Sequence, residues 1–513
     1  MPNIIKKLIS NLPFTAACSA AFLSLGGCGG SPADAAQTRA RNAVSDRGLY
    51  DAGKPRELYG LTLAQAQELA LKYNLDLWMA RQQEAIARET KHSSFLKMLP
   101  SLTFDYNLEG RDSYNASSSL GLGTGQTAQL TTYSYSADKS HSYGGMRLLW
   151  NVLDFGITYF RAKQDMNREK QADYDKQRVR QKLAADVAAA YWQCVNFDRV
   201  AARAETLRDK FTAELDNLRA GTEKGLLGET EALERSYLLK TQNARIAEFL
   251  ERRQAARVRF LQLAGLPLDA KFTLADNVTE ISDRGYALEE LESQALLQRP
   301  ELFREDLTEK ISRDEVRAAL VSLLPSPSLF INPQADSNSH LYYNSWFNAG
   351  LNLSFDLLSV PGKIADVKGN KRLLEFAKTR RMAVAVAVLT QVRLAVIEHE
   401  FALKRYRMLR DLNDDSEKIA ANLAASAQAG KAKGNAVITQ EARGLEDFAK
   451  LQDAYARVMT ARARIAESIG EGTRPGGGYR QADIAAPETP APVTAAEAEA
   501  INASVAEYLA NNG

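Results

Sequence analysis

Met98-Leu99-Pro100-Ser101 returns later in the chain as Leu323-Leu324-Pro325-Ser326. The same offset relates Asn74-Leu75-Asp76-Leu77 to Arg299-Pro300-Glu301-Leu302. Further similar segments occur in the same order in both halves. For example, Leu148-Leu149-Trp150-Asn151 corresponds to a stretch in the second half that ends at Asp356. Self-similarity at so long a period indicates one structural unit that occurs twice.

Each half is predicted to run helix, two strands, very long helix, turn, helix. In the first half, 62–99 is helical in composition and is stopped by Pro100, which lacks an amide donor. Residues 156–220 contain no proline and carry a steady apolar stripe at helical spacing. The glycines of 221–228 interrupt this stripe, and a further helix is expected over 229–264.

The predicted helix lengths indicate how the helices pack. The long helices, 156–220 and 362–428, would each span roughly 100 Å, and each shorter flanking helix, such as 436–470, would span roughly 55 Å. Two short helices placed end to end therefore match one long helix. Helices of this length have no single core to surround, so they are expected to bury their stripes against one another as coiled coils.

The strand segments alternate between apolar and polar residues. They are expected at 101–109, 143–154, 327–333 and 345–357. An apolar face opposite a small polar face suits a membrane barrel, with lipid outside and water inside. A half-buried hairpin of a soluble protein shows the same alternation, and the pattern alone leaves both readings open.

The N-terminus resembles a bacterial export signal over 1–27, with Lys6 and Lys7 before an apolar stretch. It ends in Leu25-Gly26-Gly27-Cys28, which resembles a lipobox and predicts a covalent lipid on Cys28. Ordinary cleavage nearby, with an unmodified Cys28, is the alternative. Residues 28–60 then form a linker, and 471–513 form a low-complexity C-terminal tail.

Composition argues against several classes of function. The 513 residues include 65 Lys+Arg and 63 Asp+Glu, so the net charge of +2 gives no reason to expect nucleic acid as a partner. The four histidines are scattered, no HExxH or nucleophile-elbow motif occurs, and Cys194 lies on the apolar helical stripe. The sequence therefore predicts no enzyme, with no catalytic residues and no metal ligands. The longest apolar stretch outside the signal, 382–392, is too short for a membrane helix.

Several of these segments together resemble the TolC-like outer membrane factor family. The resemblance covers about 60–470 and rests on four motifs in order: Leu61-Thr62-Leu63, Leu99-Pro100-Ser101, Leu153-Asp154-Phe155-Gly156 and Arg299-Pro300-Glu301-Leu302. It implies a mainly α fold with β strands, in which 61–270 and 271–470 are two outer membrane efflux repeats. It further implies a homotrimer with a twelve-strand outer-membrane β-barrel that a coiled-coil α-barrel continues through the periplasm.

The resemblance also implies a function. The chain would be an exit duct of a tripartite efflux system in the outer membrane, passively conducting substrates from an inner-membrane pump and a periplasmic adaptor. Lipidation at Cys28 resembles the drug-efflux branch, and no cofactor other than this lipid is expected. Two alternatives remain: an outer-membrane duct for type I protein secretion, and a periplasmic coiled-coil lipoprotein that tethers the envelope without conducting.

In this family the helical tips form the periplasmic entrance. The resemblance places adaptor docking at Gly225, Leu226, Leu227, Thr230, Gly434, Ala436, Val437 and Ile438. The second tip lacks the tyrosine and arginine that lock the entrance in the best-known member. We therefore expect Glu231 to pair with Lys431 or Lys433 as a gate latch, and solvated lysines are the equally simple alternative.

Overall fold

The structure is a computed structural model that describes residues 53–118, 133–225, 228–275, 285–429 and 434–471, residues 281 and 431, and scattered residues from 35 to 51. The chain forms two compact units, Met1–Leu58 with Leu266–Phe272, and Tyr59–Gly265 with Thr273–Gly513. In the small unit, the Tyr50 hydroxyl donates to the Leu266 carbonyl at 2.7 Å. The large unit holds the long helices and the main sheet.

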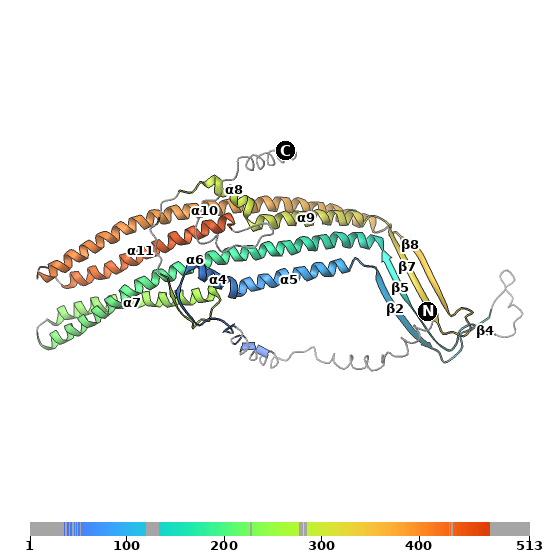
Figure 1. Cartoon of the computed structure of the whole chain (residues 1–513), viewed down its shortest axis with the longest axis horizontal. Helices are drawn as coiled ribbons and strands as arrows, with labels where there is room; N and C mark the ends of the chain where they lie inside the picture. Colours follow the sequence, from blue (N-terminus) through green and yellow to red (C-terminus); the bar gives the residue numbers. More distant parts are fainter. Residues whose placement is uncertain are drawn as a thin grey trace. The chain divides into compact units, whose positions relative to one another are not determined.

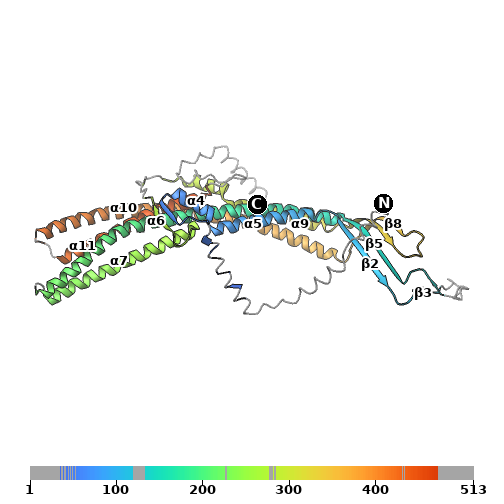
Figure 2. The same cartoon turned by 60° about the horizontal axis from the view of Figure 1, so that its bottom comes forward.

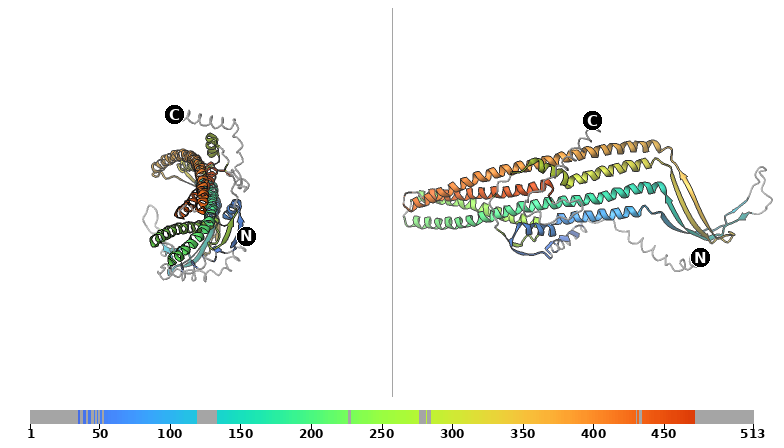
Figure 3. Two further views of the ribbon diagram at one scale, coloured as in Figure 1. Left: turned by 90° about the vertical axis from the view of Figure 1, so that its left-hand side faces the viewer. Right: turned by 45° about the horizontal axis from the view of Figure 1, so that its top comes forward.

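The large unit is a row of helices (Figures 1 and 3). Two long helices, α6 (Val152–Glu223) and α10 (Val360–Gln428), run through it. The shorter helices contact them: α4, α5 and α7 lie on α6, α8 lies on α10, and α9 and α11 contact both α6 and α10. Their bounds are α4 Leu63–Tyr73, α5 Leu75–Leu96, α7 Glu229–Ala264, α8 Leu288–Gln298, α9 Pro300–Val321 and α11 Gly434–Ile469.

Four strands form one antiparallel sheet in the order β2-β5-β7-β8 (labelled in Figure 1 and turned by 60° in Figure 2). They are β2 (Ser101–Gly110), β5 (Ser140–Asn151), β7 (Ser326–Asp336) and β8 (Ser345–Ser354). In this sheet β2 and β8 each have a strand on one side only. Four short strands complete the described part: β1 Glu57–Leu61, β3 Ala116–Ser117, β4 Ser134–Tyr135 and β6 Lys271–Leu274.

The long helices confirm the sequence prediction closely. The helix expected over 156–220 extends to Val152–Glu223, and the one expected over 229–264 has these bounds. The α6 helix has 72 residues and is therefore about 108 Å long. The α5 and α7 helices both lie along α6, which confirms the prediction that two shorter helices match one long helix.

The prediction of one unbroken helix before each strand pair was wrong. Asn74 separates α4 from α5, and Arg299 separates α8 from α9, and both residues have extended backbone. Asn74 begins α5 as its N-cap, because its side chain accepts from the Leu77 amide. Pro300 begins α9 and excludes helical backbone at the residue before it.

Strand ends also differ from the prediction. The strand expected over 143–154 ends at Asn151, whose side chain accepts from the amides of Leu153 and Asp154 and so begins α6. The strand expected over 345–357 ends at Ser354, because Asp356 caps a turn by accepting from the Leu358 amide at 3.1 Å. The strand expected over 327–333 is longer and runs over 326–336.

One described helix, α10, contains an 18-residue window of mean hydropathy 1.5, which is long and apolar enough for a membrane span by length and composition. No such helix was expected outside the signal, because the longest uninterrupted apolar stretch, 382–392, is too short for a membrane helix. Only 28% of this window is buried within the chain. Most of its apolar surface therefore has no covering element in the described part of this chain.

Candidate functional site

One face of the main sheet is apolar and exposed. Directly paired residues of an antiparallel sheet share a face, and the register joins Leu102 to Leu148, Leu148 to Ile331 and Ile331 to Ala349. On this face Leu108 is 78% exposed and Leu351 is 67% exposed. Apolar side chains that the chain leaves uncovered along all four strands form a surface suited to contact with lipid.

The opposite face of the sheet is mostly polar. It carries Thr103 paired with Arg147, and Asn332 paired with Asn348. At the helix end of this face Asn151 accepts from the Ser326 hydroxyl at 3.0 Å. One sheet therefore presents an apolar face and a water-compatible face.

The first helical tip joins α6 to α7. The α6 helix ends at Glu223, and Gly225 follows with φ +68°, a left-handed conformation that favours glycine. Gly228 precedes α7, and Thr230 is exposed in its first turn. Leu226 and Leu227 lie outside the described residues.

The latch residue Glu231 also lies at this tip. Its carboxylate accepts from Arg235 on the same helix at 2.7 Å. The Glu231 side chain is 53% exposed, so this intrahelical pair contributes little to stability and can exchange for another cation.

The second tip joins α10 to α11. The Lys431 amide donates to the Ser426 carbonyl at 2.9 Å, which closes the end of α10, and the Lys431 side chain is exposed. Lys433 lies outside the described residues, and Gly434 begins α11. Ala436 is exposed and Val437 is half-buried. Ile438 is only 8% exposed, so it supports the tip from inside.

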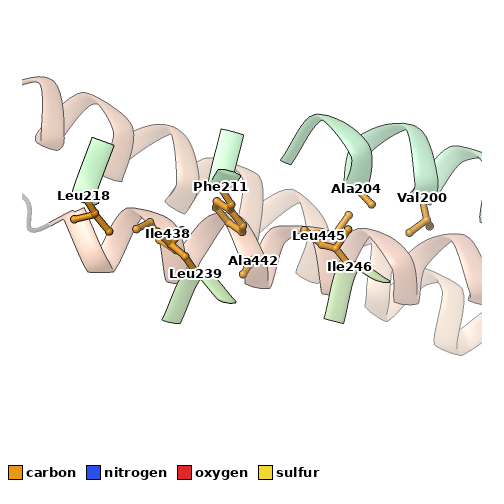
Figure 4. Packing of buried hydrophobic residues seen from close by; sticks show 9 residues of the cluster. All are labelled: Val200, Ala204, Phe211, Leu218, Leu239, Ile246, Ile438, Ala442 and Leu445. Atoms are coloured by element: carbon orange, nitrogen blue, oxygen red, sulfur yellow. The ribbon is translucent and has the colours of Figure 1, made fainter. Parts of the chain in front are cut away.

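An apolar cluster joins both hairpins behind the tips. Figure 4 shows its nine side chains from α6, α7 and α11: Val200, Ala204, Phe211, Leu218, Leu239, Ile246, Ile438, Ala442 and Leu445. Ion pairs flank the cluster, because Lys210 contacts Glu441 and Arg245 contacts Glu446. The first hairpin and α11 are therefore one packed body close to the tips.

The first junction between short helices is neutral. The Asn74 side chain is 6% exposed, and its Nδ2 donates to the Leu263 carbonyl in the last turn of α7 at 3.0 Å. Gly265 ends α7 with φ +69°, and a Cβ there would lie 2.5 Å from the Tyr73 carbonyl carbon and oxygen. A glycine is required by both the conformation and the close approach. We call this contact the Asn74 junction.

The second junction has the same geometry and a buried cation. Arg299 is 1% exposed, and its Nη1 donates to the carbonyls of Glu467 and Ser468 in the last turn of α11, each at 3.1 Å. Gly470 follows α11 with φ +75°, and a Cβ there would lie 2.8 Å from the Gln298 carbonyl oxygen. Burial lowers the pKa of Arg299, although its carboxylate partner Glu301 opposes this shift. We call this contact the Arg299 junction.

Further charges surround the Arg299 junction. Glu301 accepts from Arg299 at 2.8 Å and from Arg178 at 2.6 Å, and Arg178 also pairs with Glu467 at 2.9 Å. Arg464 extends the network to Asp186 on α6 at 2.7 Å. The buried guanidinium is therefore fully paired, which a buried charge requires.

Ion pairs also join α5 to α6 and α9 to α10. Between α5 and α6, Lys91 pairs with Glu169 at 2.7 Å, and this hydrogen bond is the main cause that lowers the pKa of Glu169. Between α9 and α10, Arg381 pairs with Asp306 at 3.5 Å. There burial is the largest influence and raises the pKa of the Asp306 carboxyl.

The histidines and cysteines that the sequence offers as reactive groups do not form a site in the described part of the chain. In the described part of the chain, no group of three or more His, Cys, Asp or Glu could hold a metal ion. Cys194 is fully buried, and burial raises its pKa to about 12, which fits the predicted packing role. His141 lies in β5, and Cys28 lies outside the described residues.

Comparisons with known proteins bear on the fold. No family model and no curated protein matches the chain. Among solved structures, the outer-membrane channel OprN is 18% identical with a TM-score of 0.64, covering 80% of this chain and 90% of that one. The Campylobacter jejuni CmeC outer membrane channel is 15% identical with a TM-score of 0.67, covering 80% and 86%. The open-state Neisseria gonorrhoeae MtrE outer membrane channel is 16% identical with a TM-score of 0.61, covering 85% and 92%.

This chain has the fold of outer-membrane channels. The fold expected from the family resemblance is thereby confirmed as a mainly helical chain with one four-stranded sheet. The described tip residues lie at the turn from α6 to α7 and at the turn from α10 to α11. The structure adds the Asn74 and Arg299 junctions, whose glycines and buried polar side chains sequence analysis did not assign.

Proposed function

We propose that the chain is the outer-membrane exit duct of a tripartite efflux system and assembles as a homotrimer. The observation that carries this proposal is the pair of open sheet edges, β2 and β8, on a sheet with one apolar and one polar face. An open edge exposes unpaired backbone groups, which a membrane does not tolerate. Pairing β8 of one copy with β2 of the next removes every edge of the sheet.

The helices support the same closure. In the row of helices, α10 forms one border, and α5 and α7 form the other. Both borders carry large apolar side chains that are exposed in the single chain, such as Phe376 (63%) and Phe401 (65%) on α10, and Ile86 (62%) on α5. A head-to-tail contact that joins unlike borders forms a closed ring when the rotation from copy to copy adds up to a full turn.

The duplicated sequence gives the proposed trimer its regularity. The predicted repeats 61–270 and 271–470 each contribute two strands and one long helix. Three copies of four strands make a twelve-strand barrel. The helices then extend it into the periplasm, where an adaptor and an inner-membrane pump deliver the substrate.

We propose that the adaptor docks at the two tips. Gly225, Thr230 and Ala436 are exposed there, and Gly434 begins α11 at the second tip. Leu226, Leu227 and Val437 complete the docking surface of this proposal, and Ile438 holds the surface in place from the core. Ile438→Ser is therefore expected to lower adaptor binding by loosening the packing beneath the tip. Ala436→Glu is expected to lower adaptor binding because the new side chain would stand in the docking surface itself.

The gate latch remains part of the proposal. Since Glu231 pairs with Arg235 on its own helix, the latch to Lys431 or Lys433 would join the tips of neighbouring copies. Each exposed pair contributes about 0.2 to 1 kcal/mol, and symmetry triples this value. Glu231→Lys should raise the open fraction in single-channel recordings, and the Arg235→Gln variant controls for loss of the intrahelical pair. An unchanged open fraction in Glu231→Lys would reject the latch.

A lipid on Cys28 would anchor each copy beside the barrel after removal of 1–27. Intact mass measurement of the mature protein tests this proposal, with Cys28→Ser as the matched variant. A mature chain that starts at another residue, or an unmodified Cys28, would show that anchoring depends on the barrel alone.

The decisive experiment is a single-channel recording of the purified protein in a planar bilayer, together with native mass measurement. We expect discrete conductance from a trimer. A non-conducting monomer or elongated dimer would favour the tethering lipoprotein. A trimeric duct that restores protein secretion, and not small-molecule efflux, in a strain lacking its own duct would favour the type I alternative.

A further inference from the structure

Two neighbouring apolar side chains, Leu149 and Phe330, lie on the mostly polar face of the sheet. The register pairs Ser101 with Leu149, Leu149 with Phe330, and Phe330 with Gly350, so these four residues cross all four strands on one face. Leu149 is 37% exposed and Phe330 is half-buried. An apolar pair on this face differs from the pattern expected of a water-lined wall.

The neighbouring rows on the same face are polar. Toward the helices lie Asn151, Ser328 and Asn352, which the register places in one row. Toward the loops lie Arg147 and Asn348, in rows paired with Thr103 and Asn332. The polar row of Arg147, Asn332 and Asn348 therefore separates Leu149 and Phe330 from Trp346, the next large apolar side chain of this face toward the loops.

Gly350 determines how the Phe330 side chain lies. A Cβ at Gly350 would lie 2.7 Å from Cζ and 2.8 Å from Cε1 of Phe330. The phenyl ring therefore occupies the space that a side chain on β8 would need. The ring therefore lies over Gly350 of β8 and adds apolar surface to the mostly polar face of the sheet.

We propose that Leu149 and Phe330 bind the apolar part of amphipathic small molecules as these leave through the barrel. This inference rests on the proposed duct, in which every copy contributes one such pair to the wall. Contact with an apolar group removes water from both surfaces, and the gain in affinity grows with every methylene removed from water. One pair of apolar side chains between polar rows gives weak binding, which permits release.

A purely structural role for Phe330 makes a different prediction. An aromatic ring over a glycine shields the strand backbone and stabilises the pairing of β7 with β8. In that case Phe330 variants would change stability, and the chain length of a passing molecule would have no effect on its binding.

The two roles of Phe330 can be separated by measuring how strongly blocking ions reduce the channel current. The full-length protein is placed in a planar bilayer, and tetraethyl-, tetrapropyl- and tetrabutylammonium are added from the loop side of the sheet. We expect block to strengthen by about threefold or more at each step in wild type, as partial burial of the added methylenes predicts. Phe330→Ser should reduce this to less than twofold per step. Phe330→Leu should retain most of the dependence, and Asn348→Ala should leave it unchanged.

The outcomes are distinguishable from those of the proposed function. Absence of any conductance overturns the duct itself. Normal conductance with block that is independent of alkyl length, or with a dependence that Phe330→Ser preserves, overturns the binding role of Leu149 and Phe330 alone. If Phe330→Ser does not fold, Leu149→Asn provides the same comparison on β5, where no glycine lies under the side chain.

Discussion

The Asn74 and Arg299 junctions solve one geometric problem with different chemistry. In both, a side chain at a helix break donates to the last-turn carbonyls of a neighbouring helix, and a left-handed glycine follows that helix. Asn74 needs one neutral hydrogen bond to Leu263. Arg299 makes five hydrogen bonds, to Glu301 (two), Glu467, Ser468 and Gln391, and therefore brings a buried charge into the second half.

The difference shows that the backbone arrangement, and not the identity of the side chain, is common to both halves. Carbonyls at a helix end accept from an amide or from a cation, and a cation also interacts favourably with the helix dipole. The cation requires partners, and Arg178, Glu301 and Glu467 provide them. The second half is therefore expected to depend on charge where the first half does not.

The largest expected effect tests what the junctions share. Gly265→Val and Gly470→Val both force a Cβ toward backbone atoms, at 2.5 Å and 2.8 Å, and both require left-handed backbone. We expect each to cost about 3 kcal/mol or more, with Gly265→Val the more severe. Apparent melting temperature and the yield of folded protein measure this loss. Gly285→Val is the control, because a Cβ there meets nothing within 4 Å; equal losses in all three variants would contradict the close approach.

The next effect separates the two junctions. Arg299→Ala leaves Glu301 and two helix-end carbonyls without their buried donor, which costs about 3 kcal/mol. Asn74→Ala removes one cap and one hydrogen bond, which costs about 1 to 2 kcal/mol. Denaturant midpoints of the two variants measure the difference. A larger loss for Asn74→Ala would contradict the ranking.

Low pH is expected to affect α5 and α9 differently. The Glu169 pKa is lowered, so its stabilisation of α5 against α6 is present above the unfolded pKa and is lost as pH falls toward about 4 and below. The Asp306 pKa is raised by burial, so protonation relieves its cost between α9 and α10 as pH falls. Amide exchange, corrected for intrinsic rate, should show α5 losing protection before α9. In Lys91→Met this difference should shrink.

The smallest expected effect is that of salt. The pairs Arg178 to Glu301 and Arg464 to Asp186 are partly exposed, so 1 M salt should weaken them by less than about 1 kcal/mol in total. Exchange at the end of α11 should then increase, and exchange at the end of α7 should not. An equal increase at both ends would show that charge does not distinguish the junctions.

Sequence patterns predicted the long helices because their apolar stripes and glycine ends are local signals. The helix over 229–264 was predicted to the residue, since Gly228 and Gly265 bound it. The breaks at Asn74 and Arg299 were missed, because helical composition continues on both sides. Local signals were present, since asparagine is a common N-cap and Pro300 favours the first helical position.

The candidate site was less accessible to sequence reasoning. The tip positions came from the family resemblance, but the burial of Ile438 depends on contacts with α6 and α7, far away in the chain. The apolar pair of Leu149 and Phe330 also requires the register between strands, and a single strand pattern does not give it. Residues whose role depends on long-range pairing were thus the ones that the sequence could not assign.

The two long helices leave the sheet in different ways. Asn151 is both the last residue of β5 and the cap of α6, so no residue lies between strand and helix. Between β8 and α10, residues 355–359 intervene, and Asp356 caps their turn. We therefore expect a change in the tilt of β5 to rotate α6 together with it. Between β8 and α10, a change in the angle of the strand can instead be taken up by residues 355–359, so α10 need not rotate with β8.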